Sequence, residues 1–296
     1  MFDSPLSRSA YEVLGVEPSA DDDTLRRAFR LRLRQTHPDA GGEAAEFIDV
    51  QRAWELVGTA EARAAYDRGH GFAATTDWRG WSPPAGAGDS RPRARAFGRA
   101  GAWRRARYEA LVREWRGDVD PYDPAVVRST PRDLRALLAG ALAEEATART
   151  IDRLGMAFTA WHGVAAGDDV LDHVVLGPSG LYGVMSLDAG GHVRFRSDEL
   201  VGEGIATPVA DLLRRVRSVA RAARVRFGGG ILVLPDDDVP AAITPLSGVR
   251  ALPIVVASRS ALGTVLRRGV PGARTVGGNE LFDVRTRLQQ AARIVG

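Results

Sequence analysis

The chain has 296 residues, 45% of them apolar and 26% charged, which is enough length for two globular units and enough apolar side chains to bury their cores. It contains no cysteine and its 40 basic side chains are all arginine, which excludes disulfides, cysteine-ligated zinc, lysine Schiff bases, phosphate-loop lysines and lysine-dependent nuclease centres. No apolar run approaches the ~20 residues that span a bilayer, and the N-terminus lacks a signal-peptide pattern, so we expect a cytoplasmic protein with no membrane partner.

The first part of the chain is expected to be helical. Helical segments are predicted over residues 10–16, 22–36, 44–58 and 60–68. Acidic residues open the second segment and arginines close it, which suits the dipole of a helix. Pro38 ends this helix, because proline lacks an N–H and disfavours helical geometry at His37. The pattern predicts two antiparallel helices joined by an exposed loop that carries His37, Pro38 and Asp39.

Residues 9–69 resemble the J-domain co-chaperones of Hsp70. The resemblance rests on four ordered motifs: AYEVLGV (10–16), LRRAFR (25–30), HPD (37–39) and ARAAYDR (62–68). It implies an all-α helical hairpin over residues 1–70 that binds ATP-bound, DnaK-type Hsp70 and stimulates its ATP hydrolysis, without catalytic residues or a cofactor of its own. The implied Hsp70-binding residues are His37, Pro38, Asp39, Arg26, Arg27, Arg30 and Arg34. Arg32 stands where the family often has an apolar residue, and Leu33 is expected to pack instead.

Residues 71–130 are expected to form a linker rich in arginine, glycine and proline, with one helix over 103–116. Between residues 91 and 116, nine arginines and two glutamates are interleaved with aromatic residues. Arginine with aromatic side chains can bind phosphates and stack on bases, so one interpretation is nucleic-acid contact through Arg104, Arg105 and Arg107. The alternative is an amphipathic helix that packs its aromatic residues on the neighbouring domain.

Residues 131–296 are expected to form an α/β domain with a short mixed sheet, which makes the whole chain an α+β multidomain protein. Two apolar runs joined by a Gly-Pro-Ser-Gly turn within residues 172–185 predict a β-hairpin. The other predicted elements are helices over 131–154, 208–227, 260–268 and 279–294, and strands over 192–195, 230–234 and 254–257. The last two strands are apolar throughout, as in a sheet covered on both faces.

Residues 134–268 also resemble the nuclease-related domain family of the restriction-endonuclease-like fold, through DHVVLGPSGLY (172–182), the Thr207-Pro208 start of the next helix and the later strands. In that family a helix glutamate, a strand aspartate and an acid-X-lysine triplet hold Mg²⁺ and place water. Asp172 matches the aspartate, and either Glu144 or Glu145 matches the glutamate. The triplet falls on residues 185–187, Met-Ser-Leu, with neither acid nor lysine. The resemblance therefore implies a degenerate domain without metal or nuclease activity.

Two alternatives to a co-chaperone with a C-terminal recruiting module remain. One is a metal-dependent nuclease that uses Asp172, and the other is a nucleic-acid-binding scaffold that uses the arginine-rich segment. His162, His173 and His192 are dispersed in the sequence, and we expect no metal site from them.

Overall fold

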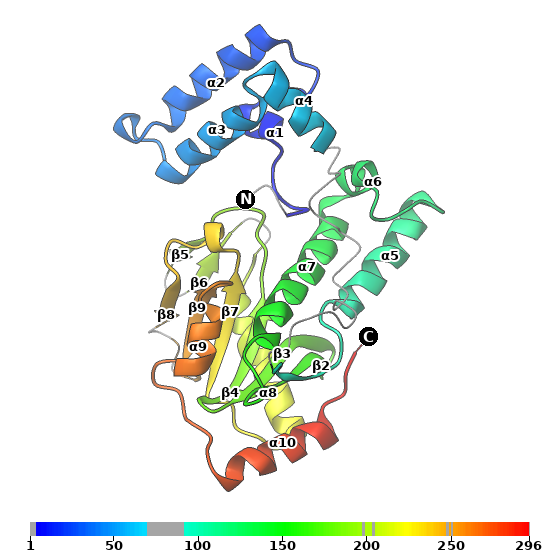
Figure 1. Cartoon of the computed structure of the whole chain (residues 1–296), viewed down its shortest axis with the longest axis vertical. Helices are drawn as coiled ribbons and strands as arrows, with labels where there is room; N and C mark the ends of the chain where they lie inside the picture. Colours follow the sequence, from blue (N-terminus) through cyan, green and yellow to red (C-terminus); the bar gives the residue numbers. More distant parts are fainter. Residues whose placement is uncertain are drawn as a thin grey trace.

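The computed structural model describes residues 4–69, 92–196, 199–202, 205–246, 249 and 251–295. The chain forms an N-terminal unit of helices (residues 4–69) and a C-terminal unit (residues 92–295) in which helices cover a mixed sheet (Figure 1). This confirms the expected α+β multidomain fold. No helix within these ranges combines the length and apolar character needed to cross a membrane.

The N-terminal unit consists of α1 (Ala10–Leu14), α2 (Asp22–Thr36), the single turn η1 (Pro38–Ala40), α3 (Ala44–Val57) and α4 (Ala60–Gly69). Ser9 and Glu12 form a capping box that starts α1, and Asp21 caps α2. The helix expected over 10–16 ends earlier, because Gly15 turns left-handed at φ 75°. Local capping chemistry therefore sets both helix starts.

The core of this unit joins its two ends. It contains Ala10, Tyr11, Val13, Leu14, Leu25, Val50, Ala53, Val57 and Tyr66. The Ala10 N–H donates to the Tyr66 hydroxyl at 2.7 Å, and the Tyr11 hydroxyl donates to Asp67 at 2.7 Å. Arg32 donates to the Val13 carbonyl at 3.2 Å, while Leu33 packs against the core. The arginine at this apolar family position is thus accommodated by a hydrogen bond, and Leu33 packs as expected.

The C-terminal unit is built on a seven-stranded sheet of order β1-β2-β3-β4-β7-β9-β8. Its strands are β1 (Arg95–Phe97), β2 (Thr159–Ala166), β3 (Asp169–Gly177), β4 (Gly180–Ser186), β7 (Gly229–Leu234), β8 (Ile243–Leu246) and β9 (Ile254–Ser258). Strands β2 to β4 form an antiparallel meander, β1, β7 and β9 add parallel pairings, and β8 is an antiparallel edge. The strand expected over 192–195 belongs instead to a separate two-stranded sheet of β5 (Arg194–Arg196) and β6 (Glu199–Val201).

Helices cover both faces of the large sheet. They are α5 (Ala102–Arg116), α6 (Pro124–Ser129), α7 (Arg132–Asp152), α8 (Pro208–Ala223), α9 (Leu262–Arg268) and α10 (Asn279–Ala291), with the single turn η2 (Asp236–Asp238). Residues of α7 and α9 share one apolar core with the sheet, and residues of α8 and α10 share the other. Strands β7 and β9 are buried on both faces as a result, which matches their continuous apolar sequences, whereas the edge strands β1 and β8 are partly exposed.

The C-terminal unit begins well before residue 131. Strand β1 pairs in parallel with β2, and α5 packs along α7 through a core that includes Tyr108, Val112 and Leu138. The helix expected over 103–116 is present as α5, but residues 92–130 belong to the folded unit because their apolar side chains are buried in it. We propose a domain boundary near residue 92; the remainder of the expected linker, residues 71–91, lies outside the described residues.

The segment before α1 joins the two units. The backbone and side chain of Leu6 lie so close to Gly190 that a Cβ at Gly190 would meet Leu6 atoms at 2.6–2.7 Å, and Leu6 is only 7% exposed. Arg135 of α7 donates to the Pro5 carbonyl at 3.2 Å. The N-terminal unit is therefore anchored to the C-terminal unit at its entry point.

Candidate functional site

The loop between α2 and α3 presents the tripeptide tip, His37-Pro38-Asp39, at the end of the helical hairpin. His37 leaves the helix with φ −63° and ψ 130°, and its Nδ1 accepts the Asp39 N–H at 3.2 Å. The His37 ring packs edge-on against Phe47 with ring centroids 5.1 Å apart. The Asp39 side chain is 93% exposed. The imidazole is thus held in place while the carboxylate projects into solvent.

A basic surface leads along α2 to the tip. We call it the arginine face, and it consists of the exposed residues Arg26, Arg27, Arg30 and Arg34. Its internal contacts are short-range: Arg26 pairs with Asp23 at 3.5 Å, Arg27 donates to Thr24 at 3.1 Å, and Arg34 donates to the Arg30 carbonyl at 3.2 Å. Such exposed contacts contribute at most about 1 kcal/mol, so these guanidinium groups can exchange them for contacts with a partner.

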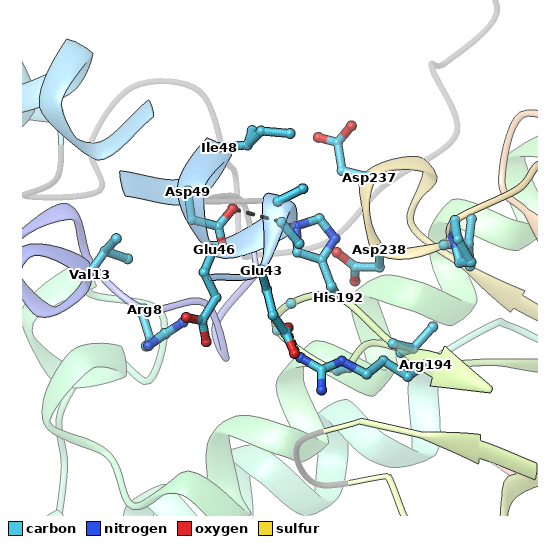
Figure 2. Close-up of a pocket in the computed structure, with 18 residues that line it drawn as sticks. Arg8, Val13, Glu43, Glu46, Ile48, Asp49, His192, Arg194, Asp237 and Asp238 are labelled. Carbon is cyan, nitrogen blue, oxygen red and sulfur yellow. Dashed lines mark hydrogen bonds and ion pairs between the residues drawn. The ribbon is translucent and has the colours of Figure 1, made fainter. Parts of the chain in front are cut away.

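The N-terminal unit docks on the C-terminal unit through α3, which leaves α2 on the far side (Figure 1). Figure 2 shows two side-chain contacts at this junction: Arg194 forms an ion pair with Glu43, and His192 Nε2 lies 3.5 Å from Asp49 Oδ1. A third pair joins Arg52 and Asp237 at 3.6 Å. A cleft of about 650 Å³ lies among these residues. The tripeptide tip and the arginine face remain accessible in the docked arrangement.

The C-terminal unit holds a cluster of buried carboxylates around Arg104 of α5. Glu144 and Asp172 are both 0% exposed. Arg104 Nε donates to Glu144 Oε1, and its Nη2 lies 3.5 Å from Asp172 Oδ1. Arg215 of α8 adds a second cation 3.6 Å from the same Asp172 oxygen. The structure thus places Glu144, and not Glu145, beside Asp172.

These residues do not fit a nuclease metal centre. Burial raises the pKa of Glu144 to about 7 and raises that of Asp172, while Arg104 opposes both shifts. Arg104 lies beside both carboxylates, and Arg215 is shared between Asp172, at 3.6 Å, and Asp169, at 3.1 Å. In the described part of the chain, no group of three or more histidine or acidic side chains could hold a metal ion. Ser186 occupies the triplet region and supplies no carboxylate.

Two histidines on consecutive strands meet on the sheet beside this cluster. His162 of β2 and His173 of β3 are register partners, and their Nδ1 atoms lie 2.8 Å apart. His173 Nε2 is 3.1 Å from Ser186 Oγ, which donates to Thr147 at 2.8 Å. Burial lowers the pKa of His162 to about 4 and lowers that of His173 well below its usual value. Sequence analysis missed this neutral network, although the register of a β2–β3 hairpin would have revealed it.

The arginines expected to contact nucleic acid point in different directions. Arg105 is buried and makes a two-point contact with Glu145, with Nη2 and Oε2 3.0 Å apart, and Arg104 is committed to Glu144 and Asp172. Only Arg107 is exposed. Arg104 and Arg105 are held in internal ion pairs, and nucleic-acid contact through Arg104, Arg105 and Arg107 stays a prediction.

Comparison with known proteins supports the reading of the N-terminal unit. Residues 9–67 match the family model of the DnaJ domain. The chain is 42% identical over 66 residues to the chaperone protein DnaJ of Thermosynechococcus vestitus, which covers 21% of this chain and 18% of that protein. It is 44% identical over 61 residues to the chaperone protein DnaJ of Lacticaseibacillus casei, which covers 20% of this chain and 16% of that protein.

The N-terminal unit is therefore a J-domain. The chain spans less than a fifth of the length of these two relatives. The similarity supports a co-chaperone role through this domain, and the C-terminal unit must be interpreted from its own geometry.

Proposed function

We propose that this protein binds the ATP-bound state of a DnaK-type Hsp70 through the tripeptide tip and the arginine face, and that it stimulates ATP hydrolysis by that partner. The observation that carries the proposal is the tip of the J-domain, where a fixed His37 ring stands beside an Asp39 carboxylate that is 93% exposed. A J-domain needs no active site for this role. It must only bind one state of the partner more tightly than the other, because a ligand shifts an equilibrium by its differential affinity.

The docking of the two units is compatible with this binding. Contacts between the units use the segment before α1 and the N-cap and body of α3, whereas the arginine face lies on α2. Positive charge on an accessible helix accelerates and orients the encounter with an acidic partner surface. We infer that the protein can engage Hsp70 without first separating its two units.

The test is steady-state ATP turnover by a DnaK-type Hsp70 with the full chain. We expect wild type to stimulate turnover, and His37→Gln and Asp39→Asn to abolish stimulation while leaving the circular dichroism and melting temperature unchanged. The exposed J-domain residue Glu17 provides a matched control, because Glu17→Gln changes one charge away from the tip and should stimulate normally. Full stimulation by His37→Gln would overturn the proposal.

We further propose that the C-terminal unit is a catalytically degenerate, nuclease-related module that recruits a target. Support comes from Arg104 and Arg215, which neutralise the carboxylates of Glu144 and Asp172, and from the absence of lysine in the chain. Incubation of the full chain with plasmid DNA and Mg²⁺ should give no cleavage. Cleavage that is lost in Asp172→Asn would refute this part of the proposal.

A further inference from the structure

The Arg104 guanidinium occupies the space between two carboxylates that have no access to solvent. Glu144 and Asp172 are 0% exposed and belong to different elements, α7 and β3. Two buried carboxylates that lie close together repel each other and lose their hydration when ionised, so a cation in the same place favours their charged forms. Arg104 supplies this cation by contacting one oxygen of each carboxylate, Oε1 of Glu144 and Oδ1 of Asp172.

The second oxygen of each carboxylate is held by the backbone. The Gly101 N–H donates to Glu144 Oε2 at 2.9 Å, and the Ser186 N–H donates to Asp172 Oδ2 at 2.7 Å. These bonds fix the rotation of both carboxylates, so that their remaining oxygens converge on the Arg104 position. Hydrogen bonds that orient ligands in this way are the usual support of a cation site in proteins.

Space for the Arg104 side chain is built into α7. A Cβ at Gly140 would lie 2.9 Å from Arg104 Cδ. Glycine in the interior of a helix destabilises it by roughly 0.5–1 kcal/mol relative to alanine, and its presence here is explained by the passage of this side chain. A pocket of about 290 Å³ is lined in part by Arg104, Gly140, Ser186 and Arg215, so the Arg104 side chain lies between this pocket and the buried carboxylates.

We propose that Arg104 is a fixed internal counter-ion that takes the place of a divalent cation between Glu144 and Asp172. The C-terminal unit consequently folds without metal, and its carboxylates form a latent divalent-cation site that Arg104 closes. Removal of the guanidinium leaves two oriented carboxylate oxygens facing a space that opens to solvent. Oxygen ligands of this kind bind Mn²⁺ and Mg²⁺, and Arg215 remains beside Asp172 as a cation that weakens the site.

The experiment compares Mn²⁺ binding by full-length wild type and Arg104→Ala, using isothermal calorimetry and thermal melting. We expect no effect of Mn²⁺ on wild type. Without metal, Arg104→Ala should melt at a lower temperature, and Mn²⁺ at about 10 to 100 times its Kd should raise that temperature by roughly 3–8 °C. The Mn²⁺ effect should disappear in Arg104→Ala/Asp172→Asn. Arg107→Ala, which removes an exposed arginine from the same helix, is the control and should behave as wild type.

Several results would overturn the proposal. Binding of Mn²⁺ by wild type that depends on Asp172 would show that the site is open, and a folded Arg104→Ala that ignores Mn²⁺ would show that no latent site exists. If Arg104→Ala stays unfolded even with Mn²⁺, a divalent cation cannot replace the guanidinium. Gly140→Ala tests separately whether α7 needs a glycine where the Arg104 side chain passes. The added methyl group should lower the melting temperature by crowding Arg104, whereas helix propensity alone predicts an increase.

Discussion

The contact between Arg105 and Glu145 offers the sharpest test of how the C-terminal unit is held together. Both side chains are almost fully buried, with 10% and 8% of their surfaces exposed, and they join α5 to α7 by a two-point contact. The Arg105 guanidinium also lies over the Tyr122 ring, 5.4 Å from its centroid. Arg105→Ala removes this cation and leaves the Glu145 carboxylate in a desolvated position.

Breaking a buried ion pair by removing one partner costs about 3–5 kcal/mol, so we expect a loss of that size from the stability of the C-terminal unit. Arg107→Ala on the exposed side of α5 should change stability by no more than about 0.5 kcal/mol. The double variant Arg105→Met/Glu145→Met should recover most of the loss, because it leaves no unpaired charge. With the single variants Arg105→Met and Glu145→Met it completes a double-mutant cycle, whose coupling energy should be at least about 2 kcal/mol.

The assay is hydrogen exchange of the full chain, followed by mass spectrometry of peptides from α5 and α7. Opening free energies measured for individual peptides report on the stability of each unit separately. A single unfolding transition measured for the whole two-unit protein does not distinguish them. If Arg105→Ala exchanges in α7 as slowly as Arg107→Ala does, the pair is not a major source of stability and the reasoning fails.

Two further predictions concern pH and the junction between the units. The pKa of His162 is about 4 in the folded state and about 6.5 in the unfolded state. Its contribution to the free energy of unfolding, roughly 3 kcal/mol, is therefore present above pH 6.5 and is lost as pH falls towards 4. The raised pKa of Glu144 has the opposite effect on stability over this pH range, so the contribution of His162 is isolated by measuring the denaturant midpoint against pH for wild type and for His162→Gln. Equal dependence of the two midpoints on pH between 6.5 and 4 would contradict the prediction. At the junction, Arg194→Glu should separate the units at low salt and increase the radius of gyration measured by X-ray scattering, and Arg194→Glu/Glu43→Arg should reverse the increase. An unchanged radius in the single variant would show that this ion pair does not hold the units together.

The N-terminal unit could be predicted almost completely because its determinants are local. Capping by Ser9 and Asp21 and the helix-ending Pro38 each act within a few residues. The end of α1 differed by two residues, because the left-handed turn at Gly15 stops the helix before residue 16, and the ends of α3 and α4 each differed by one. The position of the tripeptide tip followed directly from two helices on either side of a proline.

The C-terminal unit was predictable where an element carries its own local sequence pattern. The β3–β4 hairpin, α7, α8, β7 and β9 were expected with small differences in their ends. Strand β1 was not predicted, because it has only three residues and pairs with β2, which lies more than sixty residues later in the chain. Arg104 and Arg105 looked like surface charges because sequence patterns do not show partners forty residues away. The sequence signal that could have indicated these ion pairs is a pair of adjacent arginines on α5 and a pair of adjacent glutamates on α7, which contact each other in the same order.

The contact between Leu6 and Gly190 has a mechanical consequence. The J-domain is fastened at its entry by Leu6 and at α3 by side-chain contacts to the β5 segment, so two separated attachments restrict its rotation as well as its distance. Under the proposed function, a target held by the C-terminal unit and an Hsp70 held at the tripeptide tip would then be presented at a set spacing and heading. Such a protein would hold two bound molecules in a fixed relative orientation. One of the two attachments that fix this orientation is the close backbone approach that only glycine permits at position 190.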